Sequence, residues 1–338
     1  MEYCRTFSFS TACLLLLFLL ISPGLSAENV TSPDIALFIK EMGAKHQFDP
    51  KKLEATFGAV EIKQGILRAI AKPAERKPWH EYRKIFLTRS RINGGVKFWK
   101  NNAAILTKAQ THYGIPPEII VAIIGVETRY GKNTGGFRVI DALSTLAFHY
   151  PKRSKFFRNE LKEFLLLCRE EKMDPLQPQG SYAGAMGIPQ FMPSSFRYYA
   201  ADFDGDKKRD IWGNRQDVIG SVANYFAKHG WQRNKAIAYP VAALQENKNL
   251  RDYLADKSLK PDRTIAEFNA MGVTISEKLS SQTSAKLLAF EQKKVTDYWI
   301  GLQNFWVITR YNHSPLYALA VFQLSQEILR QHNREAEP

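Results

Sequence analysis

The stretch PPEIIVAIIGVETRYGKNTGG, residues 116–136, decides how this chain of 338 residues is interpreted. Pro116 and Pro117 suit the first turn of a helix, where a missing backbone N–H costs nothing. The isoleucines that follow are spaced three and four residues apart, and this spacing predicts a helix that carries Glu127 on its apolar face. Gly131 comes where the glycine that ends a helix is expected. The sequence therefore predicts a carboxyl group at the end of an apolar helix.

Glu127 has two interpretations in this position. Burial against apolar side chains disfavours the charged form of a carboxyl group and raises its pKa. An acid that keeps its proton near neutral pH can protonate a leaving group. Alternatively, Glu127 turns into water or pairs with Arg129 or Arg138, because most glutamates on helices are solvated.

A second stretch, QGSYAGAMGIPQFMPSSF at residues 179–196, is rich in very small side chains. Glycine lets the backbone approach a ligand closely, so this stretch is a candidate binding loop. The alternative is tight packing between helices. The Gly-Lys-Ser/Thr ending of a phosphate-binding loop is absent from the stretch. Its last letters, PSSF, predict the start of a helix.

Five segments of the chain occur together in one order: GVETRYG at 125–131, DALSTLAFHYPKR at 141–153, GSYAGAMGIPQFMPSS at 180–195, GSVANYFAKHGW at 220–231 and TRYNHSPLYALAVFQL at 309–324. With them the chain resembles the membrane-bound lytic murein transglycosylase B family over about residues 79–231 and 305–324. The resemblance implies a mainly α fold with some β structure: a lysozyme-like catalytic core, an additional N-terminal helical region and a small α/β insertion.

The resemblance also implies an enzyme that cleaves peptidoglycan between N-acetylmuramic acid and N-acetylglucosamine without water and leaves a 1,6-anhydro end. Because the muramic C6 hydroxyl attacks C1, one carboxyl group suffices, and Glu127 is implied as the acid and base. No catalytic cofactor is expected. The residues implied to line the sugar groove are Tyr82, Ser181, Gln190, Tyr225, Tyr311, Asn312 and Tyr317.

Other interpretations of these residues remain open at this point. The tyrosines could be core residues. A hydrolytic muramidase on the same fold would need a second carboxylate, for which Asp141 is a weak candidate because the letters DAL favour a helix N-cap. A non-catalytic peptidoglycan-binding protein would have no need for the acid at Glu127. His149 is expected to be structural.

The segment DFDGDKKRDIWGNRQD, residues 202–217, resembles the start of an EF-hand calcium loop. Its twelfth position is glycine instead of glutamate, so the match to a generic EF-hand is poor. By resemblance to the family, a variant loop here would hold a structural calcium ion. The implied ligand set is Asp202, Asp204, Asp206, Lys208 and Asp217. The alternative is a solvated turn followed by a helix with Asp217 as its N-cap.

The chain begins with Arg5, an apolar run over 12–21 and the letters LSA at 25–27, which predict a secretory signal peptide cleaved after Ala27. The run is too short for a standard membrane span, although a retained anchor is the alternative. Of the three cysteines, Cys4 and Cys13 precede or lie within this run, so no lipobox follows it. Cys168 is expected to be a buried thiol.

The net charge of +14 indicates an anionic partner. For an exported protein, we expect peptidoglycan strands and peripheral envelope association, no nucleic acid, and a monomer in the periplasm. The expected organisation is a signal peptide at 1–27, a helical region at 28–110, the catalytic core at 111–234, the insertion at 235–300, a segment returning to the core at 301–332, and a tail at 333–338.

Overall fold

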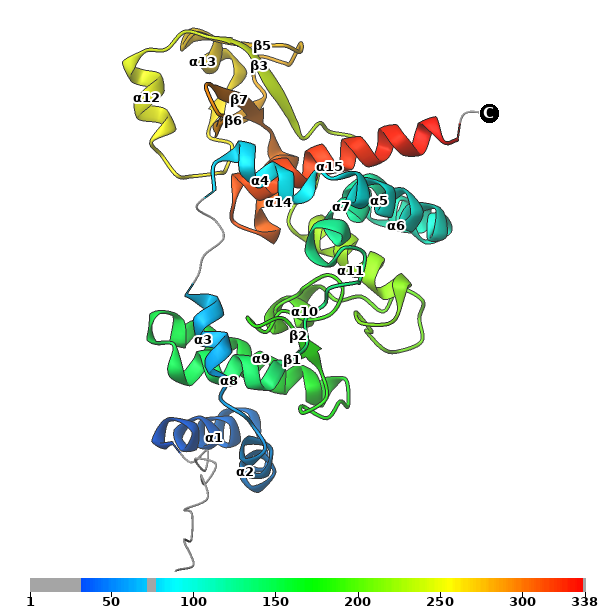
Figure 1. Ribbon diagram of the computed structural model, residues 1–338, viewed down its shortest axis with the longest axis vertical. Coiled ribbons are helices and arrows are strands. Elements are labelled where there is room, and N and C mark those ends of the chain that lie inside the picture. The colour runs from blue at the N-terminus through cyan, green and yellow to red at the C-terminus, as the bar shows by residue number, and fades with distance from the viewer. Residues whose placement is uncertain (1–31, 72–76, 337–338) are drawn as a thin grey trace, which may run out of the picture.

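A computed structural model describes residues 32–71 and 77–336 (Figure 1). The predicted signal peptide and two of the cysteines, Cys4 and Cys13, lie outside the described residues. Helices dominate the rest of the chain. Those before the glycine-rich stretch are α1 (Pro33–His46), α2 (Pro50–Gly58), α3 (Gln64–Ile70), α4 (Trp79–Phe86), α5 (Arg89–Asn101), α6 (Ala103–Tyr113), α7 (Pro117–Thr128), α8 (Val139–His149), the 3-10 helix η2 (Pro151–Arg153) and α9 (Ser154–Glu170).

The later helices are α10 (Pro193–Tyr199), α11 (Arg215–Lys228), α12 (Lys248–Leu254), α13 (Ile265–Ala270), α14 (Gln303–Tyr311) and α15 (Pro315–Arg334). The strands are β1 (Phe137–Arg138), β2 (Gln179–Gly180), β3 (Ala238–Leu244), β4 (Arg263–Thr264), β5 (Val273–Ile275), β6 (Ser284–Glu291) and β7 (Thr296–Gly301). The chain therefore has the mainly α fold with some β structure that the sequence predicts.

Helix α7 is the central helix of the larger core. Its residues from Ile119 to Val126 are all buried, so the helix is apolar on every side instead of along one stripe. Helices α5, α6, α11 and α15 pack around it (Figure 1). Complete enclosure explains why α7 lacks the polar face of a surface helix.

The end of α7 differs from the sequence prediction. Arg129, not Gly131, is the C-cap, with a left-handed φ of 51°, and Tyr130 follows at 64°. The hydroxyl of Tyr130 donates to the carbonyl of Arg91 at 2.6 Å, and a Cβ at Gly125 would lie 2.5 Å from that hydroxyl oxygen. Tyr130 therefore packs against the backbone of Gly125, where a side chain would clash. This packing places the end of α7 at Arg129, two residues before the glycine that local propensity favours.

The β strands form two separate sheets. Strands β1 and β2 make a two-stranded ladder beside α8, and β4-β6-β7-β3-β5 make an antiparallel sheet within the expected insertion at 235–300. This larger sheet packs with α12 and α13 around its own apolar cluster, which includes Leu250, Phe268 and Ile300. It lies at one end of the molecule in Figure 1, while α1 and α2 lie at the other.

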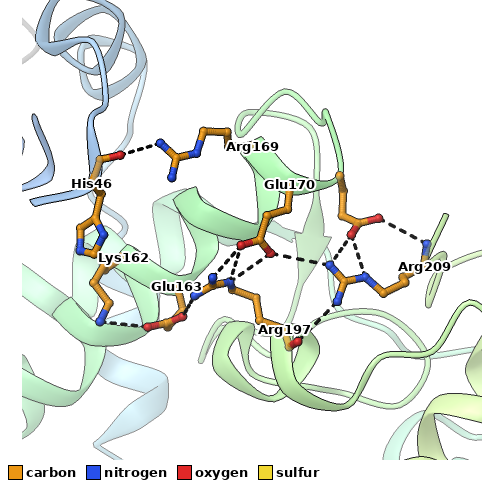
Figure 2. Close-up of polar contacts among 8 residues, drawn as sticks. His46, Lys162, Glu163, Arg169, Glu170, Arg197 and Arg209 are labelled. Carbon is orange, nitrogen blue, oxygen red and sulfur yellow. Dashed lines mark hydrogen bonds and ion pairs between the residues drawn. The ribbon is translucent and has the colours of Figure 1, made fainter. Parts of the chain in front are cut away.

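Figure 2 shows an ionic network that joins α9 to α10 and to the acidic loop at 202–217. Arg197 pairs with Glu163 and, at 2.6 Å, with Glu170. Arg209 pairs with Glu171, which also accepts from the backbone N–H of Arg209 at 3.3 Å. The network fixes the middle of the acidic loop to the C-terminal end of α9.

Cys168 is a buried free thiol, as predicted, and burial raises its pKa to about 12. Over residues 32–71 and 77–336, no helix has both the length and the apolar character needed to cross a membrane.

Candidate functional site

Glu127 is partly buried in the last turn of α7, and its partner comes from α15. The hydroxyl of Tyr317 donates to Oε1 of Glu127 at 2.5 Å, although the two residues are 190 positions apart. Tyr317 is buried, and it lies in the first turn of α15 because Ser314 caps that helix and Pro315 starts it. The ion pairs considered from sequence do not form: Arg138 binds Asp141 instead, at 2.7 Å.

Burial raises the pKa of Glu127 to about 7, while the hydrogen bond from Tyr317 acts in the opposite direction. Among the described residues, no second carboxylate contributes to this shift in the pKa of Glu127. Burial also raises the pKa of Tyr317 far above its ordinary value, with the charge of Glu127 adding to this. At neutral pH, both forms of the Glu127 carboxyl are therefore populated, and the tyrosine stays a hydrogen-bond donor.

The glycine-rich stretch forms a compact loop instead of a helix-packing segment. The backbone N–H of Ser181 donates to Ala185 at 2.8 Å, and the Ser181 hydroxyl accepts from the N–H of Ala185 at 3.1 Å. A Cβ at Gly180 would lie 2.3 Å from the carbonyl oxygen of Ala185, so only glycine permits this closure. Gln190 has a left-handed φ of 54°, and its amide donates to the carbonyls of Thr134 and Gly187.

Thr128 joins this loop to the helix that carries Glu127. Its hydroxyl donates to the carbonyl of Ile188 at 2.9 Å and accepts from the N–H of Gly131 at 3.0 Å. Thr128 is not among the site residues predicted from the sequence. The bond between Thr128 and Ile188 spans 60 residues, so the local sequence does not reveal it. Only the position of Thr128 next to Glu127 could have indicated a role.

Aromatic side chains form a continuous cluster beside the loop. Tyr311 donates to the carbonyl of Pro189 at 2.6 Å, and Tyr225 donates to the carbonyl of Arg310 at 2.5 Å. Their ring centroids are 4.8 Å apart. Both hydroxyls therefore bind the chain's own backbone. Burial raises the pKa of Tyr311, and the charge of Glu127 raises it further.

Asn312 and Tyr82 complete the predicted groove residues. Asn312 is the C-cap of α14 and is partly exposed. Tyr82 is buried in α4 between Trp79 and Phe86, and its charge contributes to the raised pKa of Tyr317. The structure thus brings Tyr82, Tyr311 and Tyr317 to the surroundings of Glu127, while their contacts with sugars remain a prediction.

Two helix N-caps considered from the sequence, Asp141 as the favoured one and Asp217 as an alternative, do not form. Asp141 is buried inside α8, where its carboxylate binds Arg138 and accepts from the backbone N–H of Glu61 at 3.0 Å. Helix α11 starts at Arg215 with Asn214 as its N-cap, so Asp217 lies inside the first turn. The carboxylate of Asp217 accepts instead from the backbone N–H groups of Phe203 and Asp210, both at 2.8 Å.

The acidic loop brings three carboxylates together. Asp202, Asp204 and Asp217 each offer an oxygen atom within 4.8 Å of the other two. Oxygen ligands on opposite sides of one calcium ion are separated by at most about 5 Å, so this donor set fits that ion. The carboxylate of Asp206 lies outside this group and accepts from the N–H of Lys208 at 2.8 Å. The loop thus gathers three of the four predicted carboxylates, and the roles of Asp206 and Lys208 as ligands remain a prediction.

Comparison with known proteins gives one consistent result. The sequence pattern of the transglycosylase SLT domain matches residues 31–326. Membrane-bound lytic murein transglycosylase B of Escherichia coli is 41% identical over 314 residues, which cover 90% of this chain and 85% of that protein.

Two solved structures are similar throughout. The catenated lytic transglycosylase SltB1 of Pseudomonas aeruginosa has a TM-score of 0.85 at 48% identity and covers 90% of this chain and 99% of its own. The E. coli lytic transglycosylase Slt35, solved in complex with calcium, has a TM-score of 0.80 at 41% identity, with coverages of 89% and 94%.

The hydrogen bond from Tyr317 stabilises the carboxylate form of Glu127, so its removal should raise the pKa of Glu127. In Tyr317→Phe we expect that pKa to rise above 7 by roughly one pH unit, the size of one charge-assisted hydrogen bond. Carbon-13 NMR of the glutamate carboxyls, with the Glu127 signal assigned by its loss in Glu127→Gln, measures it.

Tyr311→Phe is the matched control, because its hydroxyl binds Pro189 instead of Glu127. An unchanged or lower pKa in Tyr317→Phe would show that this hydroxyl does not stabilise the carboxylate.

Proposed function

The chain belongs to the lytic murein transglycosylases that carry the transglycosylase SLT domain, and we propose that it remodels or recycles cell wall by cleaving peptidoglycan glycan strands. The reaction breaks the β-1,4 bond between N-acetylmuramic acid and N-acetylglucosamine and leaves 1,6-anhydro-muramic ends. The observation that carries this proposal is the carboxyl of Glu127, with a pKa of about 7 and a single bound tyrosine hydroxyl.

In the first step, protonated Glu127 gives its proton to the glycosidic oxygen. The bond between C1 of muramic acid and that oxygen breaks, and the oxygen leaves as a hydroxyl of N-acetylglucosamine. Tyr317 occupies Oε1 of the carboxyl group, so we assign the proton transfer to Oε2. A pKa near the working pH suits this role, because the acid must both hold and release its proton.

In the second step, the Glu127 carboxylate removes the proton of the C6 hydroxyl, whose oxygen forms the new bond to C1. The carboxyl group is thereby returned to its starting form, and no water is consumed. The substrate's own acetamido group and polar groove residues would stabilise positive charge at C1 in between. Ser181, Gln190 and Asn312 are proposed to hold the sugars, and Tyr82, Tyr225, Tyr311 and Tyr317 to offer aromatic faces.

We also propose a structural calcium ion at Asp202, Asp204 and Asp217. The support is the spacing of their oxygens and the calcium complex of E. coli Slt35. Without an ion, three negative charges would lie close together, with Asp217 buried among backbone donors. An ion there would stabilise the loop that Arg209 ties to α9 (Figure 2). It would have no part in the chemistry at Glu127.

For localisation, we propose export to the periplasm, with removal of residues 1–27. A peptidoglycan substrate requires a location outside the cytoplasmic membrane, and the apolar run over 12–21 has the length of a signal peptide core. The protein would then meet its anionic substrate with a net charge of +14.

The product distinguishes this proposal from a hydrolytic muramidase on the same scaffold. Digestion of purified sacculi in oxygen-18 water should release muropeptides with unlabelled 1,6-anhydro ends that resist borohydride, as measured by mass spectrometry. Glu127→Gln should lower the rate by several orders of magnitude. Glu118→Gln, at the other end of α7, should retain it. Labelled, reducible ends would overturn the transglycosylase assignment, and a tenth of wild-type rate in Glu127→Gln would overturn the role of Glu127.

Calcium should raise the melting temperature relative to EDTA, because a ligand that binds only the folded state stabilises it by mass action. Asp204→Ala should abolish this rise. Asp210→Ala, which removes a carboxylate of the same loop that is outside the implied ligand set, should still show the rise. If millimolar calcium leaves the melting temperature of the wild type unchanged, the loop is a solvated turn.

The mature protein should begin at Glu28. N-terminal sequencing of material released from the periplasm tests this, and the expected first residue follows from the small residues that precede it. A protein that retains Met1, or one recovered with a lipid-modified cysteine, contradicts the proposed cleavage.

A further inference from the structure

A cationic patch lies where the insertion meets the catalytic half of the molecule. It consists of Lys260, Trp306 and Arg310. The ammonium of Lys260 and the guanidinium of Arg310 each lie 5.8 Å from the centroid of the Trp306 ring. The two charged groups are therefore no farther apart than about twice that distance. Trp306 is only partly buried, so an aromatic surface remains available between them.

Neither cation of the patch has an acidic partner among residues 32–71 and 77–336. The acids nearest to Lys260 in sequence, Asp256 and Asp262, both bind the buried Lys286, at 3.0 and 2.7 Å. Two uncompensated like charges beside one ring repel each other. An anion bound between them would remove that cost and gain charge-assisted hydrogen bonds.

The backbone that carries the patch is ordered by the fold. Leu259, in the insertion, packs against the larger apolar cluster, so the backbone at the neighbouring Lys260 is held against the core. Arg310 lies in the last turn of α14. The two cations are therefore presented from fixed points of the backbone.

Arg310 also connects the patch to the site around Glu127. Its carbonyl accepts the hydroxyl of Tyr225, and the next residue, Tyr311, packs against Tyr225. Tyr311 in turn binds the carbonyl of Pro189 in the glycine-rich loop. The patch is therefore continuous, through Arg310, with the aromatic cluster where the sugars are proposed to bind.

We propose that Lys260, Trp306 and Arg310 bind the free carboxylates of the peptide stem that the peptidoglycan strand carries, and so make the enzyme prefer peptide-bearing glycan. This rests on the proposed function, because the stem is presented only when the strand lies at Glu127. The carboxylates would bind the two cations, while the apolar parts of the stem would cover the indole ring.

The test compares intact glycan strands with strands whose stems an amidase has removed. In Lys260→Gln/Arg310→Gln, kcat/KM on peptide-bearing strands should fall roughly three- to tenfold, the range for two exposed charge pairs, and the wild-type preference for these strands should disappear. The matched control is Lys293→Gln/Lys294→Gln, which removes the same charge from the exposed β6–β7 turn and should retain the preference.

The outcomes separate the patch from the chemistry. If the wild-type enzyme releases no anhydro product from either substrate, the proposed function itself is overturned. An unchanged preference in the double variant, or equal losses on both substrates, would overturn the peptide site. So would an equal loss of preference in the control, because that would mean overall charge is responsible. If Lys260→Gln/Arg310→Gln keeps the substrate preference but binds vesicles of anionic phospholipid less well than the wild type, the patch belongs to a membrane surface instead.

Discussion

The enclosure of α7 is the constraint on which the rest of this structure depends. A helix that is apolar on every side must be surrounded, and α5, α6, α11 and α15 do this. Its one ionisable group near the C-terminal end, Glu127, is thereby placed where the charged form is disfavoured, with Tyr317 as its partner. The same packing that stabilises the core thus produces a carboxyl group that exchanges its proton near neutral pH.

The surroundings of Glu127 are assembled from segments far apart in the chain. Thr128 joins α7 to the glycine-rich loop, and Tyr311 joins that loop to α14. Because most of these hydroxyls are bound to backbone carbonyls, they fix the shape of the site. Sugars would then meet mainly aromatic faces and the remaining polar groups. Such preorganisation is what a reaction with a single carboxyl group requires.

Two outlying parts of the molecule, the acidic loop and the insertion, are each joined to its main body. The acidic loop is tied to α9 through the ion pair between Arg209 and Glu171. The insertion has its own apolar cluster and sheet, yet it sends Leu259 onto the main core. Both arrangements extend the surface beside the catalytic half without disturbing the packing around α7. On the proposals above, this division would let the insertion contact the peptide stem while the chemistry stays with Glu127.

The sequence by itself determined the elements whose causes are local. The two prolines and the isoleucines predicted α7 and placed Glu127 near its end, and the letters PSSF predicted the start of α10. The motifs in their order gave the family. These inferences succeed because capping, proline geometry and helical periodicity act between residues a few positions apart.

Only the tertiary structure decided the partners of the polar groups. Tyr317 was predicted to bind sugar, but nothing in the sequence indicated that its hydroxyl binds Glu127 across 190 residues. The wrong predictions have the same origin. Arg129 ends α7 in place of Gly131 because Tyr130 packs on distant backbone, and Asp141 binds the N–H of Glu61, 80 residues away, instead of capping a helix. A polar side chain binds whichever partner the fold brings to it, and that choice is not encoded in its neighbours along the chain.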